Sequence, residues 1–278
     1  MAGDRSFFAV QARRWIWGAI KLAASQPDDN DLRRDAIVFA PHPDDETLAC
    51  GGTIIRKVRA GADVRIVFLA DGRHSHRRMM SGGDLKAIRA REGLAAAAVL
   101  GLPAENVIFL EFEDRHLQGS QRAARQRVVE ILRRHPPQEI FLPYSHETTE
   151  DHFTTHRIVV SAIRRFHETV RIYEYPIWFW CHWPWAGMPL RSRRNIPARV
   201  KRNCLSGMRL LRDFRYAVYV GDVLEQKQAA LRQHRSQMER LVPDPRWRTL
   251  RDVANGEFLD CFLREYELFR RSLRAGKR

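Results

Sequence analysis

The fold of this chain is decided by one stretch, Ala36-Ile37-Val38-Phe39-Ala40-Pro41-His42-Pro43-Asp44-Asp45-Glu46. Its first five residues are apolar and predict a buried strand. A Pro-His-Pro break ends this strand, and a histidine and three acidic residues stand in and directly after it. Such groups are costly to bury unless they bind something, and open α/β sheets bind their ligands at the carboxyl ends of their strands. The stretch therefore predicts an α/β fold with a polar site at the end of this strand.

The polar side chains of this break suit a hydrolytic metal site. A catalytic zinc ion takes about three protein ligands from His, Asp or Glu and keeps a further position for water. The metal lowers the pKa of that water to about 7, and a nearby free carboxylate can take its proton. The adjacent Asp44 and Asp45 can divide this work, one as ligand and one as base. The alternative is that one of them caps the following helix, but capping leaves His42 unexplained.

A second cluster of the same kind lies about 100 residues further along the chain. It follows the apolar segment Glu139–Pro143 and reads Tyr144-Ser-His-Glu-Thr-Thr-Glu-Asp-His152. His156 comes four residues later, about one helical turn. Two strand ends, each followed by His and Asp, predict a single site at one edge of a sheet.

On these residues the chain resembles the PIG-L/LmbE-like zinc deacetylases. Ala40–Glu46 is similar to the family signature (A/P)HPDDE, Arg89–Glu92 to its R-x-x-E, and Asp151-His152 to its second metal motif. The resemblance runs from about residue 36 to residue 165, and loosely to about 240. It continues through Gly51-Gly52, Asp71-Gly72 and Leu100-Gly101, and more weakly through Lys227-Gln-Ala-Ala230 and Ser236-Gln237.

The resemblance implies a Rossmann-like, mostly parallel sheet flanked by helices, with a C-terminal extension. It also implies removal of the N-acetyl group from N-acetylglucosamine-containing substrates. By the resemblance, the zinc ligands are His42, Asp45 and His152, and Asp44 is the general base. The resemblance further places two residues near the substrate pocket, Arg89 and Glu92.

The chain departs from the family pattern at one position. Thr149 stands where the family's H-x-D-H motif has its first His, so Asp151 loses its usual partner. A hydroxyl can donate a hydrogen bond but cannot protonate an amine at neutral pH. The replacement is left open. His146 or His156 takes over, Asp44 shuttles the proton in both directions, or activity is reduced.

Length and composition are those of a protein with a sizeable core. The chain has 278 residues, 44% of them hydrophobic. We expect an N-terminal helix and linker over residues 1–35 and a single domain over 36–278. Within that domain, 36–165 forms the metal-site core and 166–278 an aromatic and basic C-terminal part. No apolar run is long enough to span a bilayer, no secretory signal is recognisable, and the four cysteines show no CxxC spacing. A cytoplasmic location, with membrane-peripheral contact as an option, is therefore expected.

The net charge of +15 points to anionic partners. An anionic membrane or an acidic or lipid-linked sugar substrate fits this charge. Nucleic acid is not expected, because no nucleic-acid-binding module is recognisable. The sequence does not determine the sugar conjugate or the oligomeric state. It also leaves the native metal open, since an Asp/His₂ site can hold Fe²⁺, Co²⁺ or Ni²⁺ as well as Zn²⁺.

Two aromatic segments allow two interpretations each. The helical segment Phe7–Leu22 mixes aromatics with cations, so it is either an interfacial membrane helix or a helix that packs its Trp face on the domain. Pro176–Trp185 holds four tryptophans between prolines. It forms either a wall for a sugar or lipid, or the seal of a loop or an oligomer interface. Basic residues follow it and favour contact with an anionic surface: Arg191, Arg193, Arg194, Arg199, Lys201 and Arg202.

The remaining pattern alternates strands and helices, as a doubly wound sheet requires. Further strands are expected at 63–69, 106–111, 139–142 and 170–175, and helices at 46–60, 84–99, 119–135, 222–240 and 257–274. The loop from Asp71 to Asp84 contains His74 and His76. These two could be metal ligands, but their spacing in a glycine-containing loop better suits a lid or an anion contact, and a solvated loop is an equal alternative.

Overall fold

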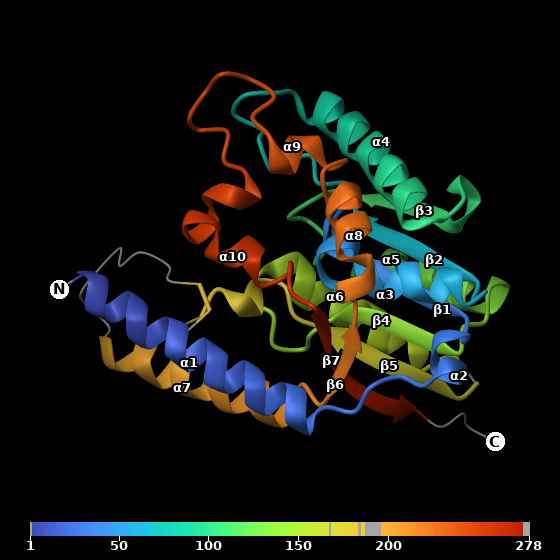
Figure 1. Ribbon diagram of the computed structural model, residues 1–278. Helices are drawn as coiled ribbons and strands as arrows, with labels where there is room; N and C mark the ends of the chain where they lie inside the picture. The colour runs from blue at the N-terminus through green and yellow to red at the C-terminus, as the bar shows by residue number, and fades with distance from the viewer. Residues whose placement is uncertain (1, 167, 183–184, 187–195, 275–278) are drawn as a thin grey trace.

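The computed structural model of the chain describes residues 2–166, 168–182, 185–186 and 196–274, with the side chains of 2–9 and 196–204 left aside (Figure 1). In the described part, seven strands form one sheet in the order β3-β2-β1-β4-β5-β7-β6. The first five strands are parallel, and β7 runs antiparallel between β5 and β6. The strands are β1 (Ala36–Ala40), β2 (Val64–Ala70), β3 (Val107–Phe112), β4 (Glu139–Pro143), β5 (Val170–Tyr175), β6 (Tyr216–Tyr219) and β7 (Tyr266–Arg274).

Helices cover both faces of this sheet. The α-helices are α1 (Ala2–Ala23), α2 (Asp29–Leu32), α3 (Asp45–Arg59), α4 (Gly82–Leu100), α5 (Gln121–Arg134), α6 (Glu150–Ile163), α7 (Ile196–Asp213), α8 (Leu224–Leu231), α9 (Arg235–Met238) and α10 (Glu257–Asp260). Short 3₁₀ segments are η1 (Ala104–Asn106), η2 (Trp178–Trp180), η3 (Gly221–Val223) and η4 (Leu250–Gly256). Side chains alternate along β1, so Val38 packs with α3, α4 and α8 while Ile37 packs with α5 and α6. The apolar run of the opening stretch is thereby buried on both faces, as a central parallel strand must be.

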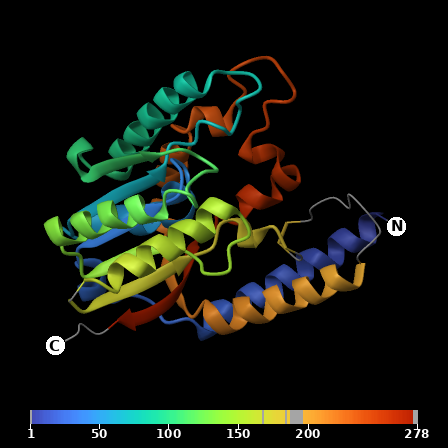
Figure 2. The same cartoon turned by 180° about the vertical axis from the view of Figure 1, so that it is seen from behind.

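Helices α1 and α7 lie side by side and extend beyond the body of the domain, as Figures 1 and 2 both show. Ile20 of α1 is buried in the core, and Ser25 forms a β-bridge with Tyr216 of β6. Trp17 packs edge-on against Trp185, with ring centroids 5.9 Å apart, whereas Trp15 is 79% exposed. Trp17 therefore packs on the domain, as one interpretation of this helix expected. Trp15 faces solvent, where the other interpretation, an interfacial helix, requires it. Among the described residues, no helix is both long and apolar enough to cross a membrane.

The paired glycines of the resemblance, Gly51 and Gly52, have a packing role. A Cβ on Gly52 would lie 2.5 Å from the Val220 side chain. The backbone N–H of Gly52 donates to Glu267 of β7 at 2.8 Å. Lys227 of α8 reaches the same buried carboxylate at 2.7 Å. The glycine therefore lets α3 approach the C-terminal part of the sheet closely.

The expected fold class is confirmed, and so are the first five strands and the helices expected at 46–60, 84–99 and 119–135, whereas α6 is a helix that the pattern did not predict. The interpretation of residues 257–274 as an amphipathic helix is wrong, because only Glu257–Asp260 is helical and Tyr266–Arg274 is β7. This strand pairs on both sides, with β5 and with β6. The predicted helix over 222–240 is interrupted between α8 and α9, where His234 turns into the core.

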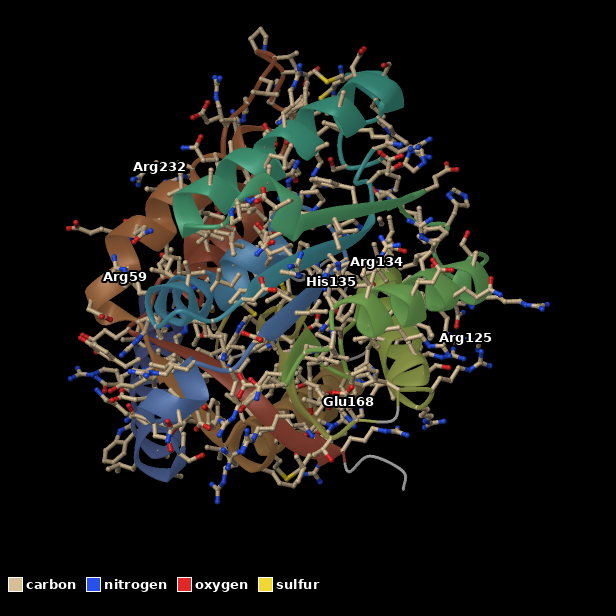
Figure 3. The ribbon with its side chains drawn as sticks, turned by 90° about the vertical axis from the view of Figure 1, so that its right-hand side faces the viewer. Arg59, Arg125, Arg134, His135, Glu168 and Arg232 are labelled. Carbon is tan, nitrogen blue, oxygen red and sulfur yellow. The ribbon has the colours of Figure 1, made fainter. Side chains whose placement is uncertain are left out.

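Positive charge is distributed over many elements of the molecule. Figure 3 shows Arg59 of α3, Arg125 and Arg134 of α5, and Arg232 after α8 on a single side of the domain. The basic positions Arg191, Arg193 and Arg194, like Trp183 of the aromatic segment, lie outside the described residues, and the side chains of Arg199, Lys201 and Arg202 are among those left aside.

Candidate metal centre

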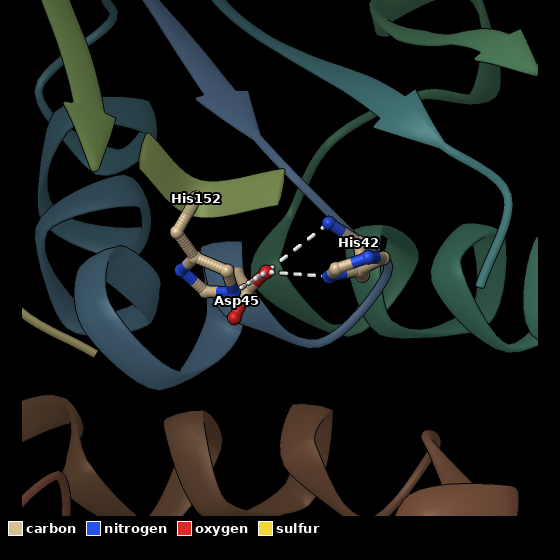
Figure 4. Close-up of side chains that lie close together, drawn as sticks. All are labelled: His42, Asp45 and His152. Atoms are coloured by element: carbon tan, nitrogen blue, oxygen red, sulfur yellow. Dashed lines mark hydrogen bonds and ion pairs between the residues drawn. The ribbon is translucent and has the colours of Figure 1, made fainter. Parts of the chain in front are cut away.

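His42, Asp45 and His152 converge at the carboxyl ends of β1 and β4 (Figure 4). The Asp45 Oδ2 atom lies 3.5 Å from His42 Nδ1 and 3.4 Å from His152 Nε2. The three ligand atoms all lie within 4.8 Å of one another. A tetrahedral zinc ion with bonds of about 2.0–2.1 Å places its ligand atoms about 3.3 Å apart. The arrangement and the chemistry of these donors therefore fit a divalent cation.

Two further carboxylates fix the orientation of the His42 ring. Its Nε2 atom lies 3.3 Å from Asp114 Oδ1 and 3.2 Å from Asp151 Oδ2. A proton held at Nε2 leaves the lone pair of Nδ1 directed toward Asp45. Histidines that bind a metal through one ring nitrogen typically donate the N–H of the other to a carboxylate in this way. Burial lowers the pKa of His42, but the hydrogen bonds to the surrounding carboxylates outweigh it and raise the pKa well above its usual value. A bound cation would take the place of the second ring proton.

His152 is buried and suited to act as a neutral ligand. Burial lowers its pKa to about 4, so the imidazole is uncharged at neutral pH. Its Nδ1 atom lies 3.9 Å from Glu147 Oε2. Glu147 in turn accepts hydrogen bonds from the backbone N–H groups of Ile177, Trp178 and Phe179, at 2.7, 2.8 and 3.3 Å. Glu147 thus holds the segment after β5 and lies near His152, whose Nδ1 has no hydrogen-bond partner among the described residues.

Asp44 lies beside this triad and faces Arg89. Its φ of 142° is strained for a residue other than glycine, as is frequent at functional sites. Its Oδ1 atom lies 3.1 Å from Arg89 Nη2, which also donates to the carbonyl of Pro43 at 2.5 Å. Burial raises the pKa of Asp44 to about 7, although the charge of Arg89 opposes the shift. Gly72 makes room for this arginine, because a Cβ there would lie 2.3 Å from Arg89 Nη1.

A cavity of about 850 Å³ opens above these groups. His42, Asp44, Asp45 and His152 line one part of it. Apolar side chains from the C-terminal half line another part: Ile177, Trp178, Leu250, Val253, Ala254 and Phe258. Arg89, Arg115 and Arg248 add positive charge to the lining. The ring of Trp178 stacks on Phe258 with centroids 4.9 Å apart, so one aromatic of the predicted wall does face the cavity.

Other tryptophans of the aromatic segment are buried instead. Trp180 and Trp185 are each 3% exposed and pack edge-on with centroids 5.0 Å apart. The guanidinium of Arg264 lies over the ring of Trp185. The interpretation of the segment as a sealed loop therefore holds for these two residues.

Thr149 and Asp151 both line the cavity. The Oγ1 of Thr149 and the Oδ1 of Asp151 are buried, and neither has a hydrogen-bond partner among the described residues. The other oxygen of Asp151 accepts from the backbone N–H of Arg115 at 2.8 Å and contacts His42. Two unsatisfied polar atoms thus stand where the family motif pairs a histidine with its aspartate.

Three residues expected at the site lie outside the cavity lining. His146 is exposed, with its ring against Tyr144, and His156 Nε2 lies 3.6 Å from Glu174. Neither histidine therefore occupies the position left by Thr149. Glu92 also points elsewhere, because it accepts from the backbone N–H of Ser236 at 2.7 Å and from its hydroxyl at 2.6 Å.

Sequence reasoning missed Asp114, which contacts the His42 ring, and Glu147, which holds the backbone of the segment after β5. It also missed His234, whose Nε2 lies 3.0 Å from Glu46 Oε1, while Glu46 Oε2 accepts from the backbone N–H of Asp44 at 2.9 Å. For Asp114 a signal existed, since it follows the expected strand at 106–111 just as the candidate ligands follow theirs. Nothing in the sequence near Glu46 indicates that it meets a histidine 188 positions away.

Comparison with known proteins agrees with this geometry. Residues 37–163 match the family model described as PIG-L: GlcNAc-PI de-N-acetylase. Diacetylchitobiose deacetylase of Thermococcus kodakarensis is 26% identical over 214 residues, which cover 75% of this chain and 71% of that protein. A 1D-myo-inositol 2-acetamido-2-deoxy-alpha-D-glucopyranoside deacetylase of a Mycobacterium species is 27% identical over 261 residues, 83% of each chain. The resemblance found in the sequence is thereby confirmed.

A solved structure extends the likeness to the fold. The N,N'-diacetylchitobiose deacetylase of Pyrococcus horikoshii superposes with a TM-score of 0.61, at 23% identity, over 86% of this chain and 84% of that one. At this identity the likeness concerns the fold alone.

We predict that Asp114→Asn weakens zinc binding about 10- to 100-fold, because the amide no longer fixes the proton on His42 Nε2. Competition with a chromogenic chelator measures the affinity. Asp222→Asn, which changes an exposed carboxylate far along the chain, is the control and should bind zinc like the parent protein. An Asp114→Asn protein with parental affinity would show that this carboxylate does not act on the metal ligand.

Proposed function

We propose that this chain, whose residues 37–163 match the PIG-L family model, removes the N-acetyl group from an N-acetylglucosamine-type sugar by metal-assisted hydrolysis. The observation that supports this most is the convergence of His42, Asp45 and His152, with Asp44 beside them and off the ligand set. The reaction breaks the amide C–N bond, forms a C–O bond to water, and yields acetate and a free amine on the sugar.

His42, Asp45 and His152 would hold the metal, for which we propose zinc. When bound, such an ion polarises the acetamide carbonyl and lowers the pKa of water. One carboxylate and two imidazoles also suit Fe²⁺ or Co²⁺, so the donor set alone does not select the native metal. Asp114 and Asp151 would hold the His42 ring in the orientation that binding needs.

Asp44 is the proposed general base. A carboxylate with a pKa near neutrality can accept a proton from the attacking water and release it to the departing amine. Arg89 holds this carboxylate in place through its contact of 3.1 Å. Since neither His146 nor His156 occupies the position left by Thr149, Asp44 would transfer the proton in both directions. The Thr149 hydroxyl, which has no acceptor among the described residues, would donate to the oxygen that gains charge in the transition state.

The cavity suggests how the sugar is held. We propose that an apolar face of the sugar packs on the wall formed by Trp178 and Phe258, since aromatic rings stack on such faces. Arg115 and Arg248 would attract an acidic group on the rest of the conjugate. An acidic or lipid-linked glycoconjugate fits both features.

We further propose that the enzyme works in the cytoplasm and contacts an anionic membrane through α1 and α7. Of the ten exposed large hydrophobic side chains in the described residues, six lie on these two helices: Val10, Trp15, Leu22, Leu205, Met208 and Leu211. Exposed cations stand among or next to them, at Arg14, Lys21, Arg212 and Arg215. Apolar side chains beside cations are typical of interfacial helices. Cys50, Cys181 and Cys261 are free thiols, as suits a reducing compartment.

We predict that Asp44→Ala lowers acetate release at least about 10²–10⁴-fold, the contribution typical of a general base, while bound zinc stays at the parental level. His42→Ala should lose the metal as well as the activity. Both are measured on metal-replete protein with a panel of acetylated glycosides. Turnover retained by Asp44→Ala would reject the assignment of the base. A metal-replete parent protein without turnover on any glycoside would instead favour a glycan- or membrane-binding protein on the same fold.

We predict that Thr149→His leaves kcat unchanged or raises it, because the new imidazole can pair with the unsatisfied Oδ1 of Asp151 and protonate the departing amine. The pH dependence of kcat should then gain a group that titrates near neutrality. Thr149→Val, which keeps the shape and removes the hydroxyl, is the matched variant and should lower kcat. A large loss in Thr149→His would show that an imidazole at this position cannot replace the threonine hydroxyl.

We predict that the protein cosediments with phosphatidylglycerol vesicles and far less with phosphatidylcholine vesicles. Trp15→Ser and Met208→Ser should each weaken the binding several-fold, since each removes apolar area from the proposed contact. Leu273→Ser is the control, because Leu273 is also exposed, at 67%, but lies on β7. Equal binding by all three variants would place the contact elsewhere.

A further inference from the structure

We propose that His74, Glu113 and His116 form a second divalent-cation site at the rim of the catalytic cavity. These residues are separate from the triad that would hold the catalytic metal, and the proposed hydrolysis does not use them. Two imidazoles and one carboxylate are the donor set of many zinc sites, with a further position left for water. The ligand class is therefore a borderline divalent metal such as Zn²⁺.

The distances between the three side chains match those of a metal site. His74 Nε2 lies 2.9 Å from Glu113 Oε1, and His116 Nδ1 lies 3.5 Å from the same oxygen. The chosen ligand atoms all lie within 4.8 Å of one another. Tetrahedral zinc needs about 3.3 Å between ligand atoms, so small side-chain rotations suffice. Nδ1 of His74 has no hydrogen-bond partner among the described residues, whereas its Nε2 faces Glu113.

The fold brings these donors together from two loops. His74 follows β2, whereas Glu113 and His116 follow β3, at the same edge of the sheet as the catalytic residues. The loops are also joined by hydrogen bonds around the cluster. The backbone N–H of His74 donates to Asp114 Oδ2 at 3.0 Å, and Arg115 donates to the His74 carbonyl at 3.3 Å. The donors are thus held in place before any ion binds.

The charges around the cluster permit a cation. Of the two arginines beside the cluster, Arg73 is paired with Asp71 at 2.5–2.7 Å, and Arg115 donates to the His74 carbonyl. Glu113 is half exposed and His116 more so, so an ion can reach them from solvent. His74 is largely buried and supplies the rigid part of the site.

The rim site would be coupled to the catalytic one through Asp114. This residue lies between Glu113 and Arg115 in sequence, and its two oxygens contact His74 and His42. An ion held by both loops would fix the turn that carries Asp114 and the cavity-lining Arg115. Occupancy of the rim site by excess Zn²⁺ would therefore change the catalytic site without competing for its ligands.

The test is the stoichiometry of Zn²⁺ binding to the full chain, measured without substrate by equilibrium dialysis and metal analysis. The parent protein should bind two equivalents. His116→Ala and Glu113→Gln should each bind one, and His42→Ala should retain one. His135→Ala removes another histidine, at the end of α5 (Figure 3), and should still bind two.

Two results would overturn the rim site: a second equivalent that persists in both His116→Ala and Glu113→Gln, or a parent protein whose single equivalent is lost only in His42→Ala. Because His116 and Glu113 are exposed, both variants should keep the parental melting temperature. Failure of the proposed catalytic site is seen separately, as a His42→Ala protein that binds as many equivalents as the parent.

Discussion

The structure depends on the crowding of buried carboxylates around His42 and His152. Four buried carboxylates, each 3–7% exposed, lie at one edge of the sheet: Asp44, Asp45, Asp114 and Asp151. Arg89 contacts only the first of them, so negative charge is in excess and would be costly to keep without a cation. The raised pKa of His42 has the same cause. Without a metal, a proton kept on this ring compensates part of the buried negative charge. A divalent metal would neutralise this charge as well, and this is the basis for proposing a hydrolytic site.

The C-terminal half of the chain completes and closes this site. His234 binds Glu46, Ser236 binds Glu92, and both contacts hold the segment around α9 against the helices of the metal-site core. The segment after β5 is fastened in a similar way by Glu147. Trp178 and Phe258, which form the apolar wall, are positioned by these contacts. The polar residues of the family motifs thus serve both chemistry and assembly, and Glu92 in this chain serves assembly.

Much of the architecture could be predicted from the sequence, because strand ends are marked by apolar runs that stop at polar residues. Asp45 and His152 follow two such runs, and the parallel sheet brings them together. Their choice, with His42, as proposed ligands came from the family resemblance. The contacts of Glu147 and His234 could not be predicted, since they depend on how loops and distant helices pack. The strand β7 was mistaken for a helix because Phe262, Tyr266 and Phe269 recur at helical spacing. Its pairing with β5 and β6 overrides that local pattern.

The central claim is that one ion is held by His42, Asp45 and His152. Anomalous diffraction at the zinc absorption edge, on crystals of the protein loaded with one equivalent of Zn²⁺, tests it most directly. The account predicts the strongest peak between His42 Nδ1, Asp45 Oδ2 and His152 Nε2, with Asp44 outside the coordination sphere. A strongest peak elsewhere, with these three side chains free of metal, would contradict it.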